Sequence, residues 1–190
     1  MYAVCSVALL AAAGLVAGCT SEPEPGPSTS KPLVTTPAPS SPTPTPTTSS
    51  PSPSATGMPA AAKVKSEAGA IAFVKYFFDQ VNLAWTTPEP DLLRSLSNPD
   101  CISCASLTTT ASDLKAKVQR YDRPPAVVRS LKFKGVVGSD HVQVTFVLDQ
   151  KLSNVVDKNG AVVLTDQPKV VERRVELEWV NSQWRVWDIA

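Results

Sequence analysis

The sequence has little excess charge of either sign and only one histidine. Its 18 basic and 17 acidic side chains nearly balance over 190 residues. A protein that holds nucleic acid or an anionic membrane through bulk charge needs a marked basic excess, so we expect no nucleic-acid partner. A zinc site needs three or four nitrogen or sulfur ligands, and one Cys-x-x-Cys pair with the distant His141 falls short of that number. We therefore expect no metal and no cofactor.

Residues 1–18 lack lysine and arginine, yet they are otherwise typical of a lipoprotein signal peptide. An apolar run from Ala3 to Ala17 ends in Val16-Ala17-Gly18-Cys19, which has the form of a lipobox. The alternatives are a transmembrane helix and an ordinary signal peptide, because about 18 apolar residues can just span a bilayer. We predict that Cys19 is acylated, with palmitate or a related chain, and anchors the protein to the outer face of a bacterial cytoplasmic membrane.

The segment from Thr20 to Ala60 has almost no apolar side chains and is dominated by proline, serine and threonine. Of its 41 residues, 12 are Pro and 18 are Ser or Thr. Such a composition offers too little apolar surface to offset the entropy lost on ordering. We expect residues 19–61 to form a disordered Pro/Ser/Thr-rich tether, and the same composition leaves open a glycosylated stalk.

Helical periodicity begins after the tether. Ser66 is a candidate N-cap for a helix over Ala70 to Trp85, and a short helix is expected over Leu92 to Leu96. Asp100 is expected to cap a third helix that ends before Arg123-Pro124-Pro125. Its predicted apolar stripe consists of Cys104, Leu107, Ala111, Leu114, Val118 and Tyr121.

From Ala126 onward the apolar period changes to two, which is typical of half-buried strands. The pattern predicts strands around Leu131 to Lys134, Val142 to Asp149, Val171 to Trp179 and Trp184 to Ile189. Asp157-Lys158-Asn159-Gly160 predicts a hairpin with a type I′ turn, and Gly138-Ser139-Asp140 predicts another connection. Helices followed by a meander of strands indicate an α+β domain over residues 62–190, with helices packed on a curved antiparallel sheet.

The helix sequence Phe73-Val74-Lys75-Tyr76-Phe77-Phe78-Asp79 and the closing Trp184-Arg185-Val186 resemble the cone-shaped fold of nuclear transport factor two and ketosteroid isomerase. The lipobox, the tether, this helix and Asn98-Pro99-Asp100-Cys101-Ile102-Ser103-Cys104 together resemble a group of actinobacterial lipoproteins of unknown function. The resemblance implies a cone-like fold and an envelope address. It transfers no catalytic residues.

Few titratable side chains fall on the predicted buried faces. Asp79, Asp113 and Asp149 lie on polar faces, and His141 adjoins a turn. Arg173 is the exception, since it lies among valines and needs an anionic partner or access to water. Tyr121 and Asp188 are the other candidates for lining a cavity.

Three functions remain open. The first is a non-catalytic domain that binds an envelope protein, a glycan or a small apolar ligand, as a monomer or weak dimer. The second is an acid-base isomerase or hydratase that uses the cone cavity. The third is a thiol oxidoreductase that uses Cys101 and Cys104. Outside the cytoplasm, and with Cys5 removed and Cys19 acylated, we expect Cys101 and Cys104 to form a structural disulfide.

Overall fold

A computed structural model describes residues 57–137 and 141–190. The expected signal peptide with Cys19, most of the expected tether and the Gly138-Ser139-Asp140 connection lie outside the described residues. The helical elements are η1 (Ala60–Lys63), α1 (Glu67–Thr86), α2 (Asp91–Arg94) and α3 (Ile102–Ala116). The strands are β1 (Arg120–Tyr121), β2 (Ala126–Val137), β3 (His141–Gln150), β4 (Ser153–Val156), β5 (Val162–Asp166), β6 (Lys169–Val180) and β7 (Gln183–Ile189).

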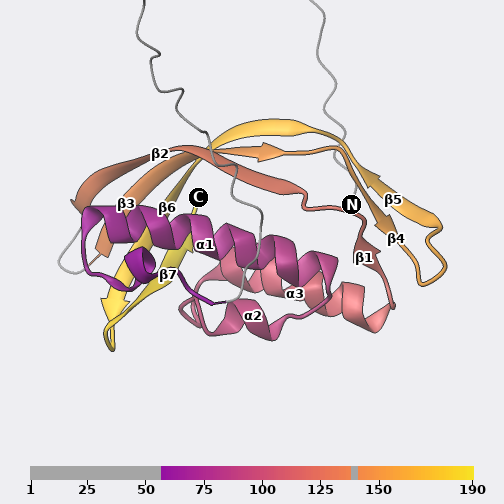
Figure 1. Ribbon diagram of the computed structural model, residues 1–190, viewed down its shortest axis with the longest axis horizontal. Helices are drawn as coiled ribbons and strands as arrows, with labels where there is room; N and C mark the ends of the chain where they lie inside the picture. The colour runs from indigo at the N-terminus through magenta and orange to yellow at the C-terminus, as the bar shows by residue number, and fades with distance from the viewer. Residues whose placement is uncertain (1–56, 138–140) are drawn as a thin grey trace, which may run out of the picture. The chain divides into compact units, whose positions relative to one another are not determined.

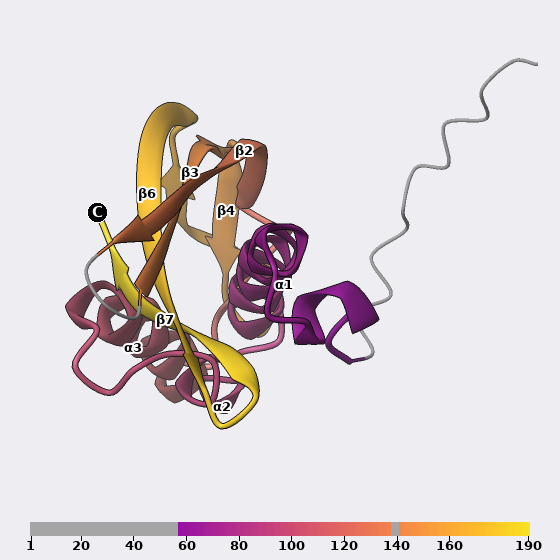
Figure 2. The same cartoon turned by 90° about the vertical axis from the view of Figure 1, so that its left-hand side faces the viewer.

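The strands form two antiparallel sheets, and the helices lie on one side of them (Figure 1). The larger sheet has the order β2-β3-β6-β7, and the smaller has the order β1-β4-β5. Figure 2 shows the long strands curving past α1 and α3. The predicted α+β class, with N-terminal helices on a curved antiparallel sheet, is confirmed. Among the described residues, no helix is both long and apolar enough to cross a bilayer.

Helix α1 is the centre of the core. Its predicted cap is confirmed, because the Ser66 hydroxyl accepts a hydrogen bond of 3.0 Å from the Gly69 amide. Gly69 is required here, since a Cβ at this position would lie 2.0 Å from the Val64 carbonyl oxygen. The residues of α1 that are buried include Phe73, Val74, Phe77, Phe78 and Val81. They pack against the inner face of the larger sheet, where Val144, Val175, Leu177 and Val186 are fully buried.

The third helix begins and ends differently from the prediction. Cys101 caps α3 in place of Asp100, because its sulfur accepts a hydrogen bond of 3.1 Å from the Cys104 amide. The helix ends at Ala116, and Val118 adopts a left-handed φ of 53° with 63% of its surface exposed. The Gln119 amide then donates to the Leu114 carbonyl at 2.9 Å, which makes a Schellman ending. Val118 and Tyr121 therefore do not continue the helical stripe.

The expected type I′ turn is at a different hairpin. In the loop between β4 and β5 the Gly160 amide donates to the Asp157 carbonyl at 3.0 Å, and Gly160 has φ 84°. Asn159 does not share that positive φ, so this turn is not type I′. The β6–β7 loop has the two successive positive values, 50° at Asn181 and 60° at Ser182. Asparagine and serine accept this conformation here because the two-residue connection between paired strands requires it.

Candidate ligand-binding site

A hollow of about 410 Å³ opens where α1 and α3 meet the ends of three strands of the larger sheet. It is lined by Phe78, Ser103, Ser106, Leu107, Leu148, Arg173, Ile189 and Ala190. We call this hollow the mouth. Its volume lies within the range of pockets that hold small molecules.

The floor of the mouth is apolar and comes from four elements. Phe78 of α1 is 4% exposed, and its ring lies 5.0 Å from that of Phe146 on β3. Leu107, Leu148 and Ile189 add aliphatic side chains from α3, β3 and β7. Removing apolar surface from contact with water lowers the free energy of the complex. This floor therefore favours an apolar ligand that displaces water.

Of the described residues that line the mouth, Arg173 alone has a cationic side chain. It pairs in register with the buried Phe146 across β3 and β6, so the two residues share one face of the larger sheet. It is exposed, and within residues 57–137 and 141–190 it makes no ion pair. Arg173 also lines a neighbouring hollow of about 490 Å³ together with Lys132, Lys134 and Arg174. An anionic group bound at the rim of the mouth, beside Arg173, would therefore meet a guanidinium that has no carboxylate partner in the described chain.

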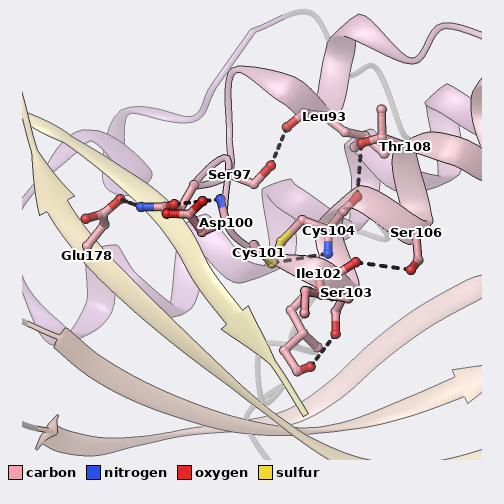
Figure 3. Close-up of a disulfide and its surroundings, with 12 residues drawn as sticks. Leu93, Ser97, Asp100, Cys101, Ile102, Ser103, Cys104, Ser106, Thr108 and Glu178 are labelled. Atoms are coloured by element: carbon pink, nitrogen blue, oxygen red, sulfur yellow. Dashed lines mark hydrogen bonds between the residues drawn. A yellow bond between two sulfur atoms is a disulfide. The ribbon is translucent and has the colours of Figure 1, made fainter.

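The Ser103 hydroxyl joins α3 to a strand that lines the mouth, and a disulfide closes the first turn of the same helix. The Ser103 hydroxyl donates to the Ile189 carbonyl at 2.7 Å, which joins α3 to β7. Cys101 and Cys104 form the predicted disulfide, and Figure 3 shows it in the first turn of the helix. The two cysteines are 2% and 1% exposed, so the sulfur atoms are hidden from a partner protein. This environment favours a structural crosslink.

Tyr121 does not line the mouth. Its hydroxyl donates to the Asp166 carboxylate at 2.5 Å, and its ring stacks on Trp85 with centroids 5.4 Å apart. Burial, then the hydrogen bond to Asp166 and its negative charge, raise the pKa of the Tyr121 hydroxyl. Tyr121 faces a different hollow of about 370 Å³ between α3 and the smaller sheet.

Asp188 is exposed and lines none of the three hollows described above. The register of β6 and β7 shifts between the pairs Glu176–Asp188 and Leu177–Val186, which leaves Trp187 as an extra residue. This bulge reverses the alternation of the strand. Ile189 consequently faces the core, and Asp188 does not share the buried face of Trp184 and Val186.

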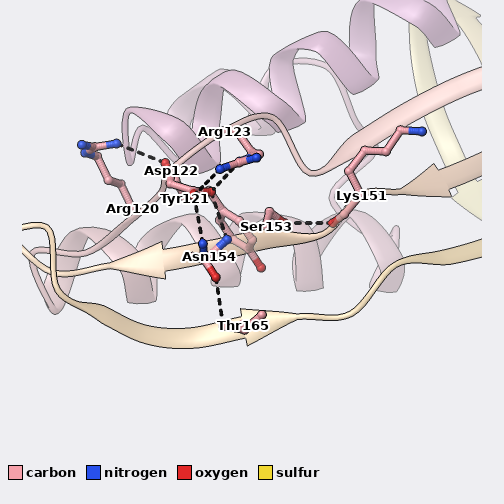
Figure 4. A network of polar contacts seen from close by, with 8 residues as sticks. All are labelled: Arg120, Tyr121, Asp122, Arg123, Lys151, Ser153, Asn154 and Thr165. Carbon is pink, nitrogen blue, oxygen red and sulfur yellow. Dashed lines mark hydrogen bonds and ion pairs between the residues drawn. The ribbon is translucent and has the colours of Figure 1, made fainter.

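A polar network that the sequence patterns did not indicate joins β1 to β4 (Figure 4). The Asp122 carboxylate accepts hydrogen bonds from the Asn154 amide at 2.9 Å and its side-chain nitrogen at 3.1 Å. Arg123 forms an ion pair of 3.1 Å with the same carboxylate. The Asn154 amide, followed by Arg123, lowers the pKa of Asp122 to about 2. Asp122 and Arg123 precede two prolines and belong to no periodic apolar pattern. Periodicity therefore does not predict this network.

The His141 ring lies against the Trp187 ring, tilted by 31° with centroids 4.3 Å apart, and His141 is not among the residues that line the mouth. Among the described residues, no three histidine, cysteine, aspartate or glutamate side chains are grouped so as to hold a metal ion.

The fold is similar to that of several solved structures. The intermembrane space region of the chloroplast protein ARC6 aligns with a TM-score of 0.50 and 17% identity, covering 67% of this chain and 96% of that one. Aln2 from a Streptomyces species aligns with a TM-score of 0.44 and 11% identity over 64% of this chain and 88% of that one. A variant of Rd1NTF2_05 aligns with a TM-score of 0.35 and 8% identity over 61% and 93%. At these identities the likeness concerns the fold alone.

No curated protein matches the sequence. Residues 42–189 match a family described as "Family of unknown function (DUF6318)".

Proposed function

The chain belongs to the DUF6318 family of unknown function, and from its residues we propose that it is a membrane-anchored lipoprotein with a non-catalytic binding domain. The domain would hold a small apolar molecule that carries an anionic group, with the apolar body on the floor of the mouth and the anion at Arg173. The observation that carries this proposal is that Arg173, which forms no ion pair with the described residues, lies above the apolar floor.

The side chains of the mouth support binding over acid-base catalysis. A general acid or base must titrate near neutral pH within hydrogen-bond reach of the substrate. The side chains around this hollow are apolar, hydroxyl-bearing or, at Arg173, permanently charged. A guanidinium holds its proton at all working pH values, so it can orient an anion but cannot exchange a proton with it.

The burial of Cys101 and Cys104 argues against the thiol oxidoreductase. A redox-active pair needs a thiolate that a partner disulfide can reach. A disulfide in the first turn of α3 instead holds Ser103 in its position beside Ile189. We assign the crosslink a structural role in shaping the mouth.

We further propose that residues 1–18 are removed, that Cys19 is acylated, and that the part of the tether that precedes η1 separates the domain from the membrane. This organisation matches that of the actinobacterial lipoproteins which the sequence resembles. Two or three acyl chains at about 0.8 kcal/mol per buried methylene hold a protein firmly on a membrane. Residues in polyproline II conformation extend by about 3.1 Å each, so the tether would let the domain reach away from the bilayer.

The ligand proposal is tested with decanoate, a straight apolar chain with one carboxylate, and with decanol as its uncharged counterpart. Binding is followed by calorimetry on the wild-type protein, on Arg173→Gln and on the matched control Arg174→Gln. Arg174 is also an exposed arginine of β6, but it does not line the mouth.

We expect Arg173→Gln to weaken decanoate binding about 3- to 10-fold, which corresponds to about 1 kcal/mol for a charged contact at an exposed rim. Decanol binding should stay unchanged in both variants. Equal effects of the two arginine substitutions, or no saturable binding of either ligand, would contradict the proposal.

A further inference from the structure

The hollow of about 490 Å³ that adjoins the mouth gathers basic side chains. Lys132, Lys134 and Arg174 line it, and Glu172 contributes a carboxylate. These three cationic side chains form no ion pair with the described residues. The whole chain has a formal net charge of only +1, so the excess of positive charge in this hollow is local.

The register of three strands puts Lys132, Thr145 and Arg174 in one row. Lys132 pairs with Thr145 across β2 and β3, and Thr145 pairs with Arg174 across β3 and β6. Paired residues share a face of the sheet, and successive residues of one strand alternate between the faces. Val144 and Phe146, on either side of Thr145, are 0% and 2% exposed in the core. The row therefore lies on the outer face, which is turned away from α1 and α3 (Figure 1). We call this hollow the outer hollow.

A β-bulge in β2 sets Lys132 on the outer face. Arg129 pairs with Val147 and Lys132 pairs with Thr145, so β2 has one residue more than β3 between the two pairs. Without the extra residue, Arg129 and Lys132 would point to opposite faces, because they are an odd number of positions apart. Ser130, inside the bulge, has a left-handed φ of 55°. Such backbone conformations are unfavourable for serine, and they cluster at binding sites.

We propose that the outer hollow binds one phosphoryl group, as inorganic phosphate or as a phosphomonoester. Neighbouring strands lie about 4.8 Å apart, so the backbones of Lys132 and Arg174 are about 10 Å apart, with Thr145 between them. The long side chains of both cations can converge above the Thr145 hydroxyl. An ammonium, a hydroxyl and a guanidinium fork then offer donors to the three terminal oxygens of a phosphomonoester.

Acidic neighbours limit the size of the anion. Glu172 and Glu176 lie two positions on either side of Arg174 along β6, so all three share the outer face. The two carboxylates repel any further anionic group beside the row, which favours a single phosphoryl group over an extended polyanion. Arg173 also borders the outer hollow, but alternation turns its side chain to the inner face with the mouth. The phosphoryl site is therefore independent of the ligand proposed for the mouth.

A nuclear magnetic resonance titration of the full chain in non-ionic detergent with inorganic phosphate tests this site. Sodium chloride keeps the ionic strength constant, so that screening does not change. We expect saturable shift changes at the amides of Lys132, Thr145 and Arg174. Lys132→Gln and Arg174→Gln should each raise the dissociation constant about 3- to 10-fold. Thr145→Val should raise it about 3-fold, because it removes a donor and keeps both charges. The matched control is Lys169→Gln, since Lys169 is an exposed lysine of β6 outside the hollow, and it should stay within about 2-fold of the wild-type value.

Phosphatidate added to the same micelles distinguishes a lipid headgroup from a free phosphate. Shift changes at the same three amides with phosphatidate would support the site and extend it to lipid headgroups. Changes with inorganic phosphate alone would support it and restrict it to soluble phosphates. The proposal is overturned if neither probe gives saturable changes there, if Lys169→Gln weakens binding as much as Lys132→Gln does, or if Thr145→Val leaves binding unchanged.

Discussion

Replacing Phe77 by alanine should remove a large part of the stability of the folded domain. The Phe77 ring is 1% exposed on the buried face of α1, and it meets the ring of Phe78 edge-on at a centroid distance of 5.5 Å. Deleting a buried phenylalanine side chain costs about 3 to 5 kcal/mol, from lost transfer free energy and from the cavity left behind. A domain of this size has only about 5 to 15 kcal/mol of total stability.

The loss is measured by urea unfolding, followed by far-ultraviolet circular dichroism and tryptophan fluorescence. At about 3 to 5 °C per kcal/mol, the same loss should lower Tm by roughly 9 to 25 °C. Ile102→Ala is the control, because Ile102 is 80% exposed on α3, and its truncation should change stability by less than about 0.5 kcal/mol. A loss below about 1.5 kcal/mol for Phe77→Ala would refute the placement of this ring at the centre of the core.

Four further predictions concern the anchor, the tether, the pH profile and the disulfide. Cys19→Ala should release the protein from membranes or leave it unprocessed, as fractionation would show, and firm binding of a cleaved variant would contradict acylation. A chain of residues 57–190 should unfold at the same Tm as the complete mature chain, and a markedly lower value would mean that the tether docks. The pKa of Asp122 is lowered to about 2 in the folded protein, so its stabilising effect is complete above about pH 4 and disappears toward pH 2. The stability difference between wild type and Asp122→Asn should shrink over that interval in acid titrations, and a constant difference would exclude the assigned role. The Cys101–Cys104 disulfide should have a reduction potential below about −300 mV with slow alkylation of the reduced thiols, whereas about −120 to −200 mV with rapid alkylation would favour the oxidoreductase.

Periodicity predicted the elements whose burial is one-sided. Helix α1 and strands β3, β6 and β7 each place apolar residues on one face of a regular element, so the spacing alone located them. The cap at Ser66 and the Cys101–Cys104 pairing were also predictable, because each depends on residues close together in sequence. These local features are sufficient to indicate the α+β class from the sequence.

The misplaced features depend on backbone conformations that composition does not determine. The left-handed Val118 ends α3 early, although a β-branched residue is unfavourable there by about 1 to 2 kcal/mol. The bulge at Trp187 turns Asp188 away from the buried face, and no residue type in that strand signals it. Tyr121 lines the hollow between α3 and the smaller sheet and not the mouth, and its hydrogen bond to Asp166, 45 residues away in the sequence, is a tertiary contact that periodicity does not predict.

The mouth was predictable only in part. Arg173 is a cation among valines in the sequence, and this pattern indicates the site. The hydroxyl of Ser103 was missed because its acceptor is the backbone of Ile189, which only the tertiary fold brings within 2.7 Å.

The central claim, that the mouth binds an apolar anion, is tested most directly by a nuclear magnetic resonance titration with decanoate. We predict saturable shift changes that gather at Phe78, Leu107, Leu148, Ile189 and the Arg173 guanidinium, with the smaller sheet unaffected. Shift changes centred on another surface, or none up to millimolar decanoate, would contradict the claim.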